Sequence, residues 1–304
     1  MPPQPAPARA LPPLSSSASR GIALMIAAIF MFSLMDVAAK AISARADTIM
    51  ALWARYAGQM LIVTLIVLPR LRSVTRTRYP GVHFARSLLL LMASTFAFFG
   101  IARLGLAEAT AVMATNPVLI TLGAAVFLGE RLGWRRLAGI GAALCGAMII
   151  IRPGTDVFSL DALLPLGAAT CFACFAVLTR KVGRDESPWT SLFYTAMVGG
   201  LVLSVAVPWF WVPPDLTIVA WMVFIGLAGA AGQLLFIRAL SVAEAGTVAP
   251  FSYCSVVFAT ILGFLIFAEV PDALTLMGAL VIICAGLYVW RRETRAVHEA
   301  GPQA

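Results

Sequence analysis

Four ionisable side chains stand inside apolar runs of the sequence, in addition to Glu108 and Glu244, which lie nearer the ends of their runs. The four are Asp36, Lys40, Arg55 and Arg86. A charge at the centre of a membrane helix costs about 2.5–3.5 kcal/mol on insertion scales, so such residues normally face a water-filled cavity or an oppositely charged partner. The chemistry that these residue types suggest is the binding of charged groups on a solute. A carboxylate binds a cation, and a guanidinium binds a carboxylate or phosphate through two parallel hydrogen bonds.

The first two of these residues are spaced for one face of a helix. Ser33, Asp36 and Lys40 stand at positions i, i+3 and i+7, which places them on the same side. Asp36 and Lys40 are also four residues apart, a spacing at which opposite charges pair. Two interpretations therefore remain open: the face lines a cavity, or the pair satisfies itself. Lys40 is also close enough to its helix end to extend to the surface.

The two arginines have similar alternatives. Arg55 is expected about two turns into the second apolar run, at a depth similar to that of Asp36. It can bind an anionic group of a solute, or it can be the structural partner of Asp36. Arg86 and Ser94 share one face of the third run, and Arg86 lies about one turn from the helix end. It can line the same cavity or extend to the water at that end.

Two prolines interrupt apolar runs at related places. Pro117 lies in the fourth run and Pro250 in the ninth. A proline removes a backbone hydrogen bond from a helix, and in lipid the freed carbonyl needs another partner. Interrupted helices at related places in two halves point to a transport site. We therefore expect a substrate-binding region near these helix breaks, with hydrogen bonds from Asn116, Gln233 and Tyr253.

A succession of apolar runs must position these residues. Of the 304 residues, 61% are hydrophobic and 12% are charged, and the mean hydropathy is +0.93. Runs of about 20 apolar residues without the period-two alternation of a β-barrel indicate helices that cross a membrane. We predict an all-α membrane protein with ten transmembrane helices, at residues 21–43, 48–69, 81–102, 106–128, 134–151, 160–179, 187–208, 217–237, 244–268 and 273–290.

The two ends of the chain differ from these spans. Residues 1–19 are rich in Pro, Ala and Ser, which predicts a disordered N-terminal tail, and residues 292–304 are predicted to be a cytoplasmic tail. The loops on the side of the N-terminus hold sixteen of the 22 basic residues, and the opposite loops hold three. Basic loops face the cytoplasm, so we predict a multi-pass protein with both termini cytoplasmic.

The chain also contains an internal duplication. Leu106-Ala-Glu-Ala109 recurs as Val242-Ala-Glu-Ala245, and each copy opens a span that contains a proline. The two units are residues 21–152, with helices 1–5, and residues 160–291, with helices 6–10. Because five is an odd number of crossings, the second unit must be inserted upside down relative to the first. Inverted repeats of this kind are typical of transporters.

These two units resemble the drug/metabolite transporter superfamily, in its EamA branch of ten-helix carriers. The resemblance rests on "LAEATAVMATNPVLITLGAAVFLGERLGWRRLAGIGAALCGAMIIIRPG" and on the similar second-half segment that ends in "FAEV", and it covers nearly the whole chain except the tails. Within the branch, "MDVAAK", "WARY" and "RSLLLLMAST" resemble bacterial carriers for riboflavin or S-adenosylmethionine uptake. The resemblance implies a secondary transporter that moves a small metabolite across the bacterial inner membrane by alternating access. An exporter of amino acids or other metabolites is the alternative.

The sequence lacks the motifs that are typical of other classes of function. The formal charge of +8 lies mainly in short loops, where the topology explains it, so nucleic-acid binding is not expected. There is no Walker A sequence, no HExxH and no GxSxG, and Cys171-x-x-Cys174 has no second Cys/His pair nearby. We therefore predict no catalytic residues, no cofactor and no metal site. The expected partners are the lipid bilayer and a small-molecule substrate. An intramembrane enzyme or a receptor subunit remains the alternative of another class.

Overall fold

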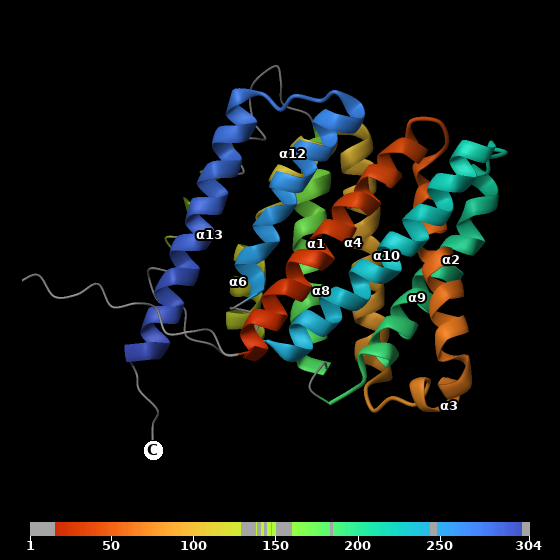
Figure 1. Cartoon of the computed structure of the whole chain (residues 1–304), viewed down its shortest axis with the longest axis horizontal. Helices are drawn as coiled ribbons and strands as arrows, with labels where there is room; N and C mark the ends of the chain where they lie inside the picture. Colours follow the sequence, from red (N-terminus) through yellow and green to blue (C-terminus); the bar gives the residue numbers. More distant parts are fainter. Residues whose placement is uncertain are drawn as a thin grey trace, which may run out of the picture.

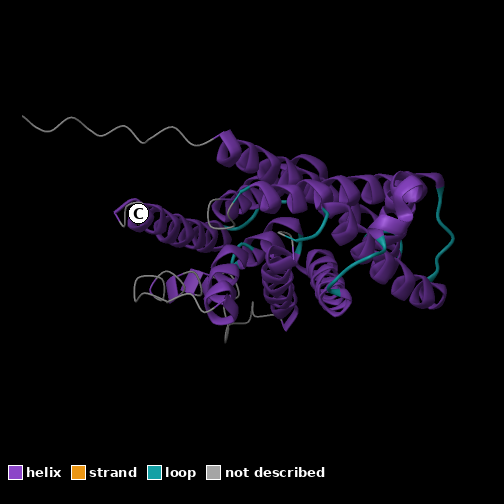
Figure 2. Ribbon diagram, turned by 90° about the horizontal axis from the view of Figure 1, so that it is seen from below, coloured by secondary structure: helices purple, strands orange, loops and turns teal. Residues whose placement is uncertain are grey.

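The computed structural model describes residues 16–128, 138, 141–142, 145–146, 148–149, 160–182, 185–243 and 248–299. Within these residues every regular element is a helix (Figure 1, Figure 2). The long helices are α1 (Ser16–Ser43), α2 (Thr48–Val67), α4 (Pro80–Leu104), α8 (Leu163–Val182), α9 (Pro188–Ala206), α10 (Leu216–Val242) and α13 (Ala273–Glu299). The shorter elements are α3 (Leu71–Val74), α5 (Leu106–Met113), α6 (Asn116–Leu128), α12 (Cys254–Phe267) and the 3₁₀ turns Leu68–Arg70, Leu160–Ala162, Val207–Phe210 and Ala249–Tyr253.

Six segments of the described chain are long and apolar enough to cross a membrane. They correspond to the first, second, third, sixth, seventh and eighth predicted spans, and they are Ser19–Ser43, Thr48–Val74, Pro80–Leu104, Leu160–Val182, Pro188–Phe210 and Leu216–Val242. Their outer faces carry leucines that are more than half exposed, such as Leu61, Leu65, Leu201 and Leu227. Extended apolar surface of this kind is unfavourable in water and suits contact with lipid chains.

Two predicted spans are interrupted rather than continuous. In the first unit, α5 ends at Met113 and α6 begins at Asn116, so the interruption lies directly before Pro117. In the second unit, the 3₁₀ turn Ala249–Tyr253 contains Pro250 and leads into α12. Both prolines stand in the first turn of the element they begin, where the missing N–H is not needed.

One predicted span is mostly not described, and the two ends of the helical region extend beyond the prediction. The span 134–151 lies mostly outside the described residues, so the count of ten helices stays a prediction. α1 begins at Ser16, inside the segment 1–19 that was predicted to be a tail. α13 continues to Glu299, inside the predicted tail 292–304. Neither extension contains a proline or glycine, so nothing in them ends the helix.

Short loops with side-chain caps define several helix starts. The Asp47 carboxylate accepts the backbone N–H of Ile49 at 2.7 Å before α2, and the Asp215 carboxylate accepts that of Ile218 at 2.7 Å before α10. These bonds satisfy N–H groups that have no partner within the helix. Gly105 alone separates α4 from α5, and its φ of +106° is a conformation that side-chain-bearing residues rarely adopt.

Corresponding helices of the two units run in opposite directions. We call the end of the bundle where α1 begins the lower end and the end where α1 finishes the upper end, as in Figure 1. Asp161, just before α8, pairs with Arg103 in the last turn of α4, at the upper end. α8 therefore runs downward while its counterpart α1 runs upward. Contacts between the units also occur in exchanged pairs: α1 packs on α10 and α8 on α4, while α2 packs on α9.

Two glycines make a close backbone contact between the units. A Cβ on Gly226 of α10 would lie 2.9 Å from the Cα of Gly58 on α2, and a Cβ on Gly58 would lie 2.8 Å from the Cα of Gly226. Backbone lies on both sides of this contact, so no side-chain movement can make room for a methyl group. Small residues allow membrane helices to pack this closely, and they gain van der Waals contact from it.

We predict that Gly226→Ala lowers the thermal unfolding temperature in detergent by several degrees, because α2 and α10 must separate. Overpacking of this kind costs about 1–3 kcal/mol. The matched control is Gly81→Ala in α4, where a Cβ would meet nothing within 4 Å and the unfolding temperature should stay the same or rise. Equal effects of the two substitutions would contradict the assigned packing.

Candidate functional site

A polar cluster lies between α2 and α4 within the bundle. Nη1 of Arg55 donates a hydrogen bond to Oγ of Ser94, and the hydroxyl of Tyr56 lies 3.0 Å from the same Oγ. Ser94 donates its own hydrogen to the carbonyl of Leu90 at 2.7 Å. Because the serine hydroxyl has one hydrogen, it accepts from both Arg55 and Tyr56. The hydroxyl thus fixes the guanidinium and the phenol relative to α4.

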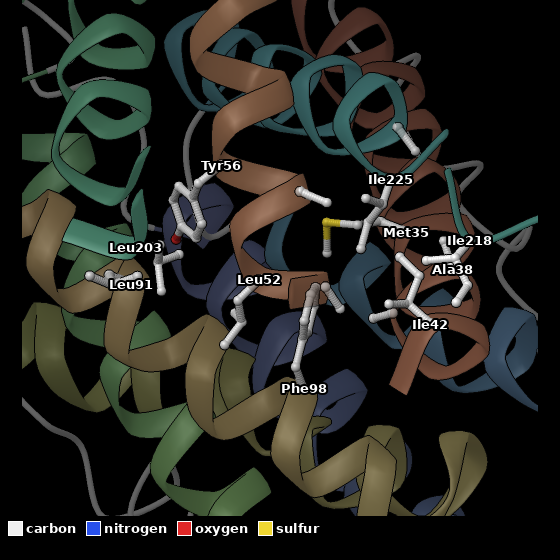
Figure 3. Packing of buried hydrophobic residues seen from close by; sticks show 14 residues of the cluster. Met35, Ala38, Ile42, Leu52, Tyr56, Leu91, Phe98, Leu203, Ile218 and Ile225 are labelled. Carbon is white, nitrogen blue, oxygen red and sulfur yellow. The ribbon is translucent and has the colours of Figure 1, made fainter. Parts of the chain in front are cut away.

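The guanidinium of Arg55 is buried next to two aromatic rings, those of Tyr56 and Phe98, which are labelled in Figure 3. Its Cζ lies 4.9 Å from the centre of the Tyr56 ring and 5.7 Å from that of Phe98, and Gly229 of α10 packs on its stem. Arg55 is 3% exposed, and its Nε has no hydrogen-bond partner. Cation–π contacts compensate part of the lost hydration of a cation. The residue nevertheless retains hydrogen-bonding capacity.

Asp36 lies on α1 beside this cluster and is partly exposed, although it is within a membrane-spanning segment. Arg55 is the charged residue that acts on it electrostatically. Within the described chain, however, no cationic nitrogen lies within 4.0 Å of its carboxylate and no hydrogen bond reaches it. Arg55 therefore acts on Asp36 without forming a direct ion pair with it.

The three residues of the predicted polar face of α1 do not act together, because each has different surroundings. Ser33 is buried and donates its hydroxyl to the carbonyl of Ile29 at 3.0 Å in the same helix. Lys40 does not pair with Asp36; it forms an ion pair with Glu269, and its Nζ lies 4.8 Å above the ring of Phe267. Only Asp36 of this face retains an unpaired polar group.

Glu269 joins the two units at the upper end. Besides its pair with Lys40, its Oε2 accepts the backbone N–H of Leu106, the first residue of α5, at 3.2 Å. A carboxylate at a helix start is favourable because the unpaired N–H groups there carry partial positive charge. We name Lys40, Glu269 and Leu106 the upper contact. It links α1 and α5 of the first unit to the segment after α12 in the second.

The two helix breaks lie against each other. Asn116 begins α6 and Tyr253 ends the 3₁₀ turn before α12, and Tyr253 packs with Ala111 and Val112 of α5. Oδ1 of Asn116 and the hydroxyl of Tyr253 are both buried without a hydrogen-bond partner. The interruptions thus bring two unsatisfied polar groups from opposite units into one region. Pro117 itself is buried there.

A second buried glutamine, which the sequence analysis did not single out, shares the properties of Gln233. Both Gln233 on α10 and Gln59 on α2 are 0% exposed, and neither amide has a hydrogen-bond partner. Gln59 follows Arg55 by four residues, and Gln233 follows Gly229, on which Arg55 packs, by four residues. The spacing of Gln59 to Arg55 was the one available signal for it.

A second charged cluster lies at the lower end, around Glu186 in the loop between α8 and α9. Its Oε1 accepts hydrogen bonds from Oγ1 of Thr77 at 2.5 Å and from the backbone N–H of Arg78 at 2.8 Å, and its Oε2 lies 2.7 Å from Nε2 of His83. Burial alone would raise the pKa of Glu186, but the bonds from Thr77, His83 and Arg78 outweigh it and hold that pKa below the ordinary range.

Arg86 belongs to this lower cluster and not to the site of Ser94. It is 0% exposed, so it does not extend to water as one interpretation required. It donates from Nε to Thr179 Oγ1 at 3.2 Å and from Nη1 to Nδ1 of His83 at 3.4 Å, and its Cζ lies 5.1 Å from the Phe175 ring. Since Arg86 can only donate, Nδ1 of His83 accepts and Nε2 carries the hydrogen given to Glu186. We name Thr77, His83, Arg86, Thr179 and Glu186 the lower network.

The predicted site residues thus fall into three groups. Asp36, Arg55 and Ser94 lie together in the middle of the bundle, while Asn116, Tyr253 and Gln233 supply unsatisfied polar atoms elsewhere in the interior. Lys40 and Arg86 belong to contacts at opposite ends. The side chain of Pro250 lies outside the described residues. In the described chain no group of three metal-ligating side chains comes together.

The sequence is similar to a known family of proteins. The model of the EamA-like transporter family matches the chain twice, at residues 19–152 and 160–291. One solved crystal structure superposes with a TM-score of 0.66 at 20% identity, covering 90% of this chain and 98% of its own, which shows a shared fold.

Curated relatives are similar over nearly the whole chain. The riboflavin transporter of Rhizobium johnstonii is 32% identical over 289 residues, covering 92% of this chain and 94% of the relative. The S-adenosylmethionine uptake transporter of Rickettsia bellii is 28% identical over 279 residues, covering 92% and 96%. The pseudopaline exporter CntI of Pseudomonas aeruginosa is 29% identical over 278 residues, covering 90% and 96%.

We predict that Glu186→Gln destabilises the protein by about 1–3 kcal/mol near pH 7, because a buried network loses its charged acceptor. A depressed pKa stabilises the folded state above the unfolded value, 4.5, and this contribution is lost as the pH falls further. The difference in unfolding temperature between wild type and Glu186→Gln should therefore shrink below pH 4.5.

The matched control for this measurement is Asp185→Asn. The neighbouring carboxylate accepts an exposed hydrogen bond from the Tyr79 hydroxyl at 3.3 Å, so its loss should change the unfolding temperature little at any pH. If the difference in unfolding temperature between wild type and Glu186→Gln does not change with pH, the charge of Glu186 does not contribute to the network.

Proposed function

This chain belongs to the EamA-like transporter family, and from that membership we propose that it is a secondary carrier that works by alternating access in a bacterial inner membrane. It is a multi-pass membrane protein and a transporter of small metabolites, not an enzyme. Alternating access requires a site that opens to one side of the membrane while the other side is closed.

The observation that supports this mechanism is the presence of inter-unit contacts at both ends of the bundle. The upper contact joins α1 and α5 to the segment that follows α12. The lower network joins α4 and the segment before it to α8 and the loop that follows α8. Rocking of one unit against the other would break one set while keeping the other. Switching transitions commonly repack interface ion pairs in this way.

We assign the substrate region to the interior between these contacts. Asp36 and Arg55 would interact with charged groups of the solute, with Ser94 holding the guanidinium in place. Asn116 and Tyr253 at the helix breaks, and Gln233, would supply neutral hydrogen bonds. Lys40 and Arg86, which the sequence suggested as substrate ligands, are assigned to the two closing contacts instead. Pro117 and Pro250 would keep the helices interrupted.

The direction of transport and the solute belong to the same proposal. The relatives carry names of both importers and an exporter, so we favour uptake of a solute like S-adenosylmethionine or riboflavin, with export of amino acids or other metabolites as the second candidate. The lower end, where the predicted basic loops gather, would face the cytoplasm, with both termini on that side.

Purified protein in liposomes tests the carrier function. Vesicles preloaded with unlabelled solute should take up labelled S-adenosylmethionine or riboflavin by counterflow, whereas protein-free vesicles should not. Export would appear as faster release from vesicles in which the upper end faces outward, because the solute then leaves through the side that is opposite to the cytoplasm. Failure to move any metabolite of a broad panel, or formation of a modified product in its place, would overturn the proposal.

We predict that Glu269→Gln favours the state open at the upper end. The amide keeps a hydrogen bond to Leu106 but loses the ion pair with Lys40. The pair is partly exposed and contributes about 1 kcal/mol, so the ratio of open to closed molecules should rise roughly fivefold. The measurement is the labelling rate of a cysteine at Ser33, in a cysteine-free background, by an impermeant reagent applied from the upper side.

The control is Arg45→Gln, which removes an exposed positive charge at the same end without touching the upper contact. It should leave the labelling rate unchanged. An unchanged rate in Glu269→Gln would remove the upper contact from the mechanism without affecting the family assignment.

A further inference from the structure

We propose that the segment between α2 and α4 is a binding surface for the headgroups of anionic phospholipids at the lower end of the bundle. The segment consists of the 3₁₀ turn Leu68–Arg70, α3 (Leu71–Val74) and the loop residues 75–79, and we call it the arginine segment. It carries Arg70, Arg72, Arg76 and Arg78. The inference goes beyond the proposed transport function, because it concerns a surface outside the substrate region.

The arginine segment lies at the level of the lipid headgroups. α2 has 20 residues, which corresponds to about 30 Å of helix. The hydrocarbon core of a bilayer is also about 30 Å thick, so the residues after α2 reach the polar region at the lower end, where α3 lies in Figure 1. Leu65 and Leu68, which directly precede the arginines, are 62% and 58% exposed. The arginines therefore continue a lipid-facing apolar surface.

Apolar side chains hold the arginine segment against the bundle. Val74 is 6% exposed and packs in one core cluster with Val67 of α2 and Leu192 of α9, and Leu71 packs against the same cluster. The four arginines are all exposed. Apolar residues that face the protein and basic residues that face outward are typical of segments at a membrane surface.

The charges of the four arginines are not neutralised within the described chain, where no ion pair includes any of them. The acidic residues of the neighbouring loop have other partners. Asp185 accepts the hydroxyl of Tyr79, and Glu186 accepts from His83 and from the backbone N–H of Arg78. Clustered basic residues next to a membrane span attract anionic lipids, and a guanidinium binds a phosphate through two parallel hydrogen bonds. The partner that fits this surface is therefore a phospholipid with a net negative headgroup.

The arginine segment is also bonded to the second unit. The hydroxyl of Tyr194 on α9 donates to the carbonyl of Thr75 at 2.8 Å, and Glu186 accepts from Thr77 and from the backbone of Arg78. These bonds fix the segment while the lower end is closed, and opening of that end would break them. A ligand that binds the fixed segment more tightly shifts the population toward the closed state. Bound lipid would therefore favour closure of the lower end, a step that rests on the proposed alternating access.

The test compares lipids that differ in headgroup charge. Purified protein in detergent is titrated with dioleoylphosphatidylglycerol, with dioleoylphosphatidylcholine, which has the same chains and no net charge, and with inorganic phosphate. The anionic lipid should raise the unfolding temperature at concentrations at least about tenfold lower than the neutral one, and added salt should reduce this difference. Inorganic phosphate should have little effect, because it lacks the acyl chains that hold a headgroup at this level.

Substitutions assign the binding to the arginine segment. The double variant Arg72→Gln/Arg76→Gln should bind phosphatidylglycerol at least about tenfold more weakly and phosphatidylcholine unchanged. Arg72→Lys/Arg76→Lys keeps the charges and should retain most of the affinity. The matched control is Arg20→Gln/Arg45→Gln, which removes two exposed positive charges near the ends of α1 and should bind like wild type. All replaced side chains are exposed, so these variants should fold.

The effect on the lower end is measured separately. Ser87 of α4 is 0% exposed and lies one turn from His83 of the lower network. A cysteine at this position, in a cysteine-free background, should react with an impermeant maleimide at least about threefold more slowly in nanodiscs of phosphatidylglycerol than in nanodiscs of phosphatidylcholine. Arg72→Gln/Arg76→Gln should remove the difference.

Equal effects of the two lipids on wild type, or an unchanged affinity in Arg72→Gln/Arg76→Gln, would overturn the lipid surface. Stabilisation by inorganic phosphate as strong as that by phosphatidylglycerol would replace it with a simple anion site. Lipid binding with no change in labelling would overturn the effect on closure alone. Absence of flux for every solute would defeat the proposed carrier function, whereas the binding measurements do not depend on transport.

Discussion

The whole arrangement depends on one constraint: hydrocarbon does not solvate charge, so each ionisable group of the spans must find its compensation inside the protein. Arg86 meets this requirement within the lower network, and Lys40 meets it through Glu269. Arg55 meets it in part, with a hydroxyl and two aromatic rings. Asp36 meets it through partial exposure within the bundle. Residues whose charge has a full set of protein partners hold the units together. Residues whose charge is only partly compensated remain available to a solute.

Sequence reasoning located the elements well because each depends on local properties. Long apolar runs predicted the six described segments that are long enough to cross a membrane, and prolines marked the two interruptions, since apolar length and a missing N–H act within one segment. Partners were harder to predict. Arg86 and Ser94 share a face of α4, but their partners come from α8 and α2, which spacing within one helix cannot reveal. Gln59 escaped notice because a neutral amide among apolar residues carries no charge signal.

The exchanged packing of the two units is symmetric, whereas the contacts that close the ends are not. α1 on α10 repeats as α8 on α4, because duplicated helices keep their backbone packing. The upper contact joins Lys40, Glu269 and the backbone of Leu106, and the lower network connects a carboxylate, an imidazole and a guanidinium in series. Side chains have diverged while packing has not. The two ends therefore differ in the chemistry that holds the units together.

The buried amides of Gln59 and Gln233 add a free-energy argument to this picture. With contacts formed at both ends, these four amide atoms are fully buried and have no partner. Each unsatisfied buried group costs about 1–3 kcal/mol relative to a hydrogen-bonded one. Any rearrangement that admits water or a polar solute to these amides relieves this cost. The two helices that carry them, α2 and α10, pack backbone on backbone at Gly58 and Gly226, so a rearrangement that separates these helices exchanges this close contact for hydration of the amides.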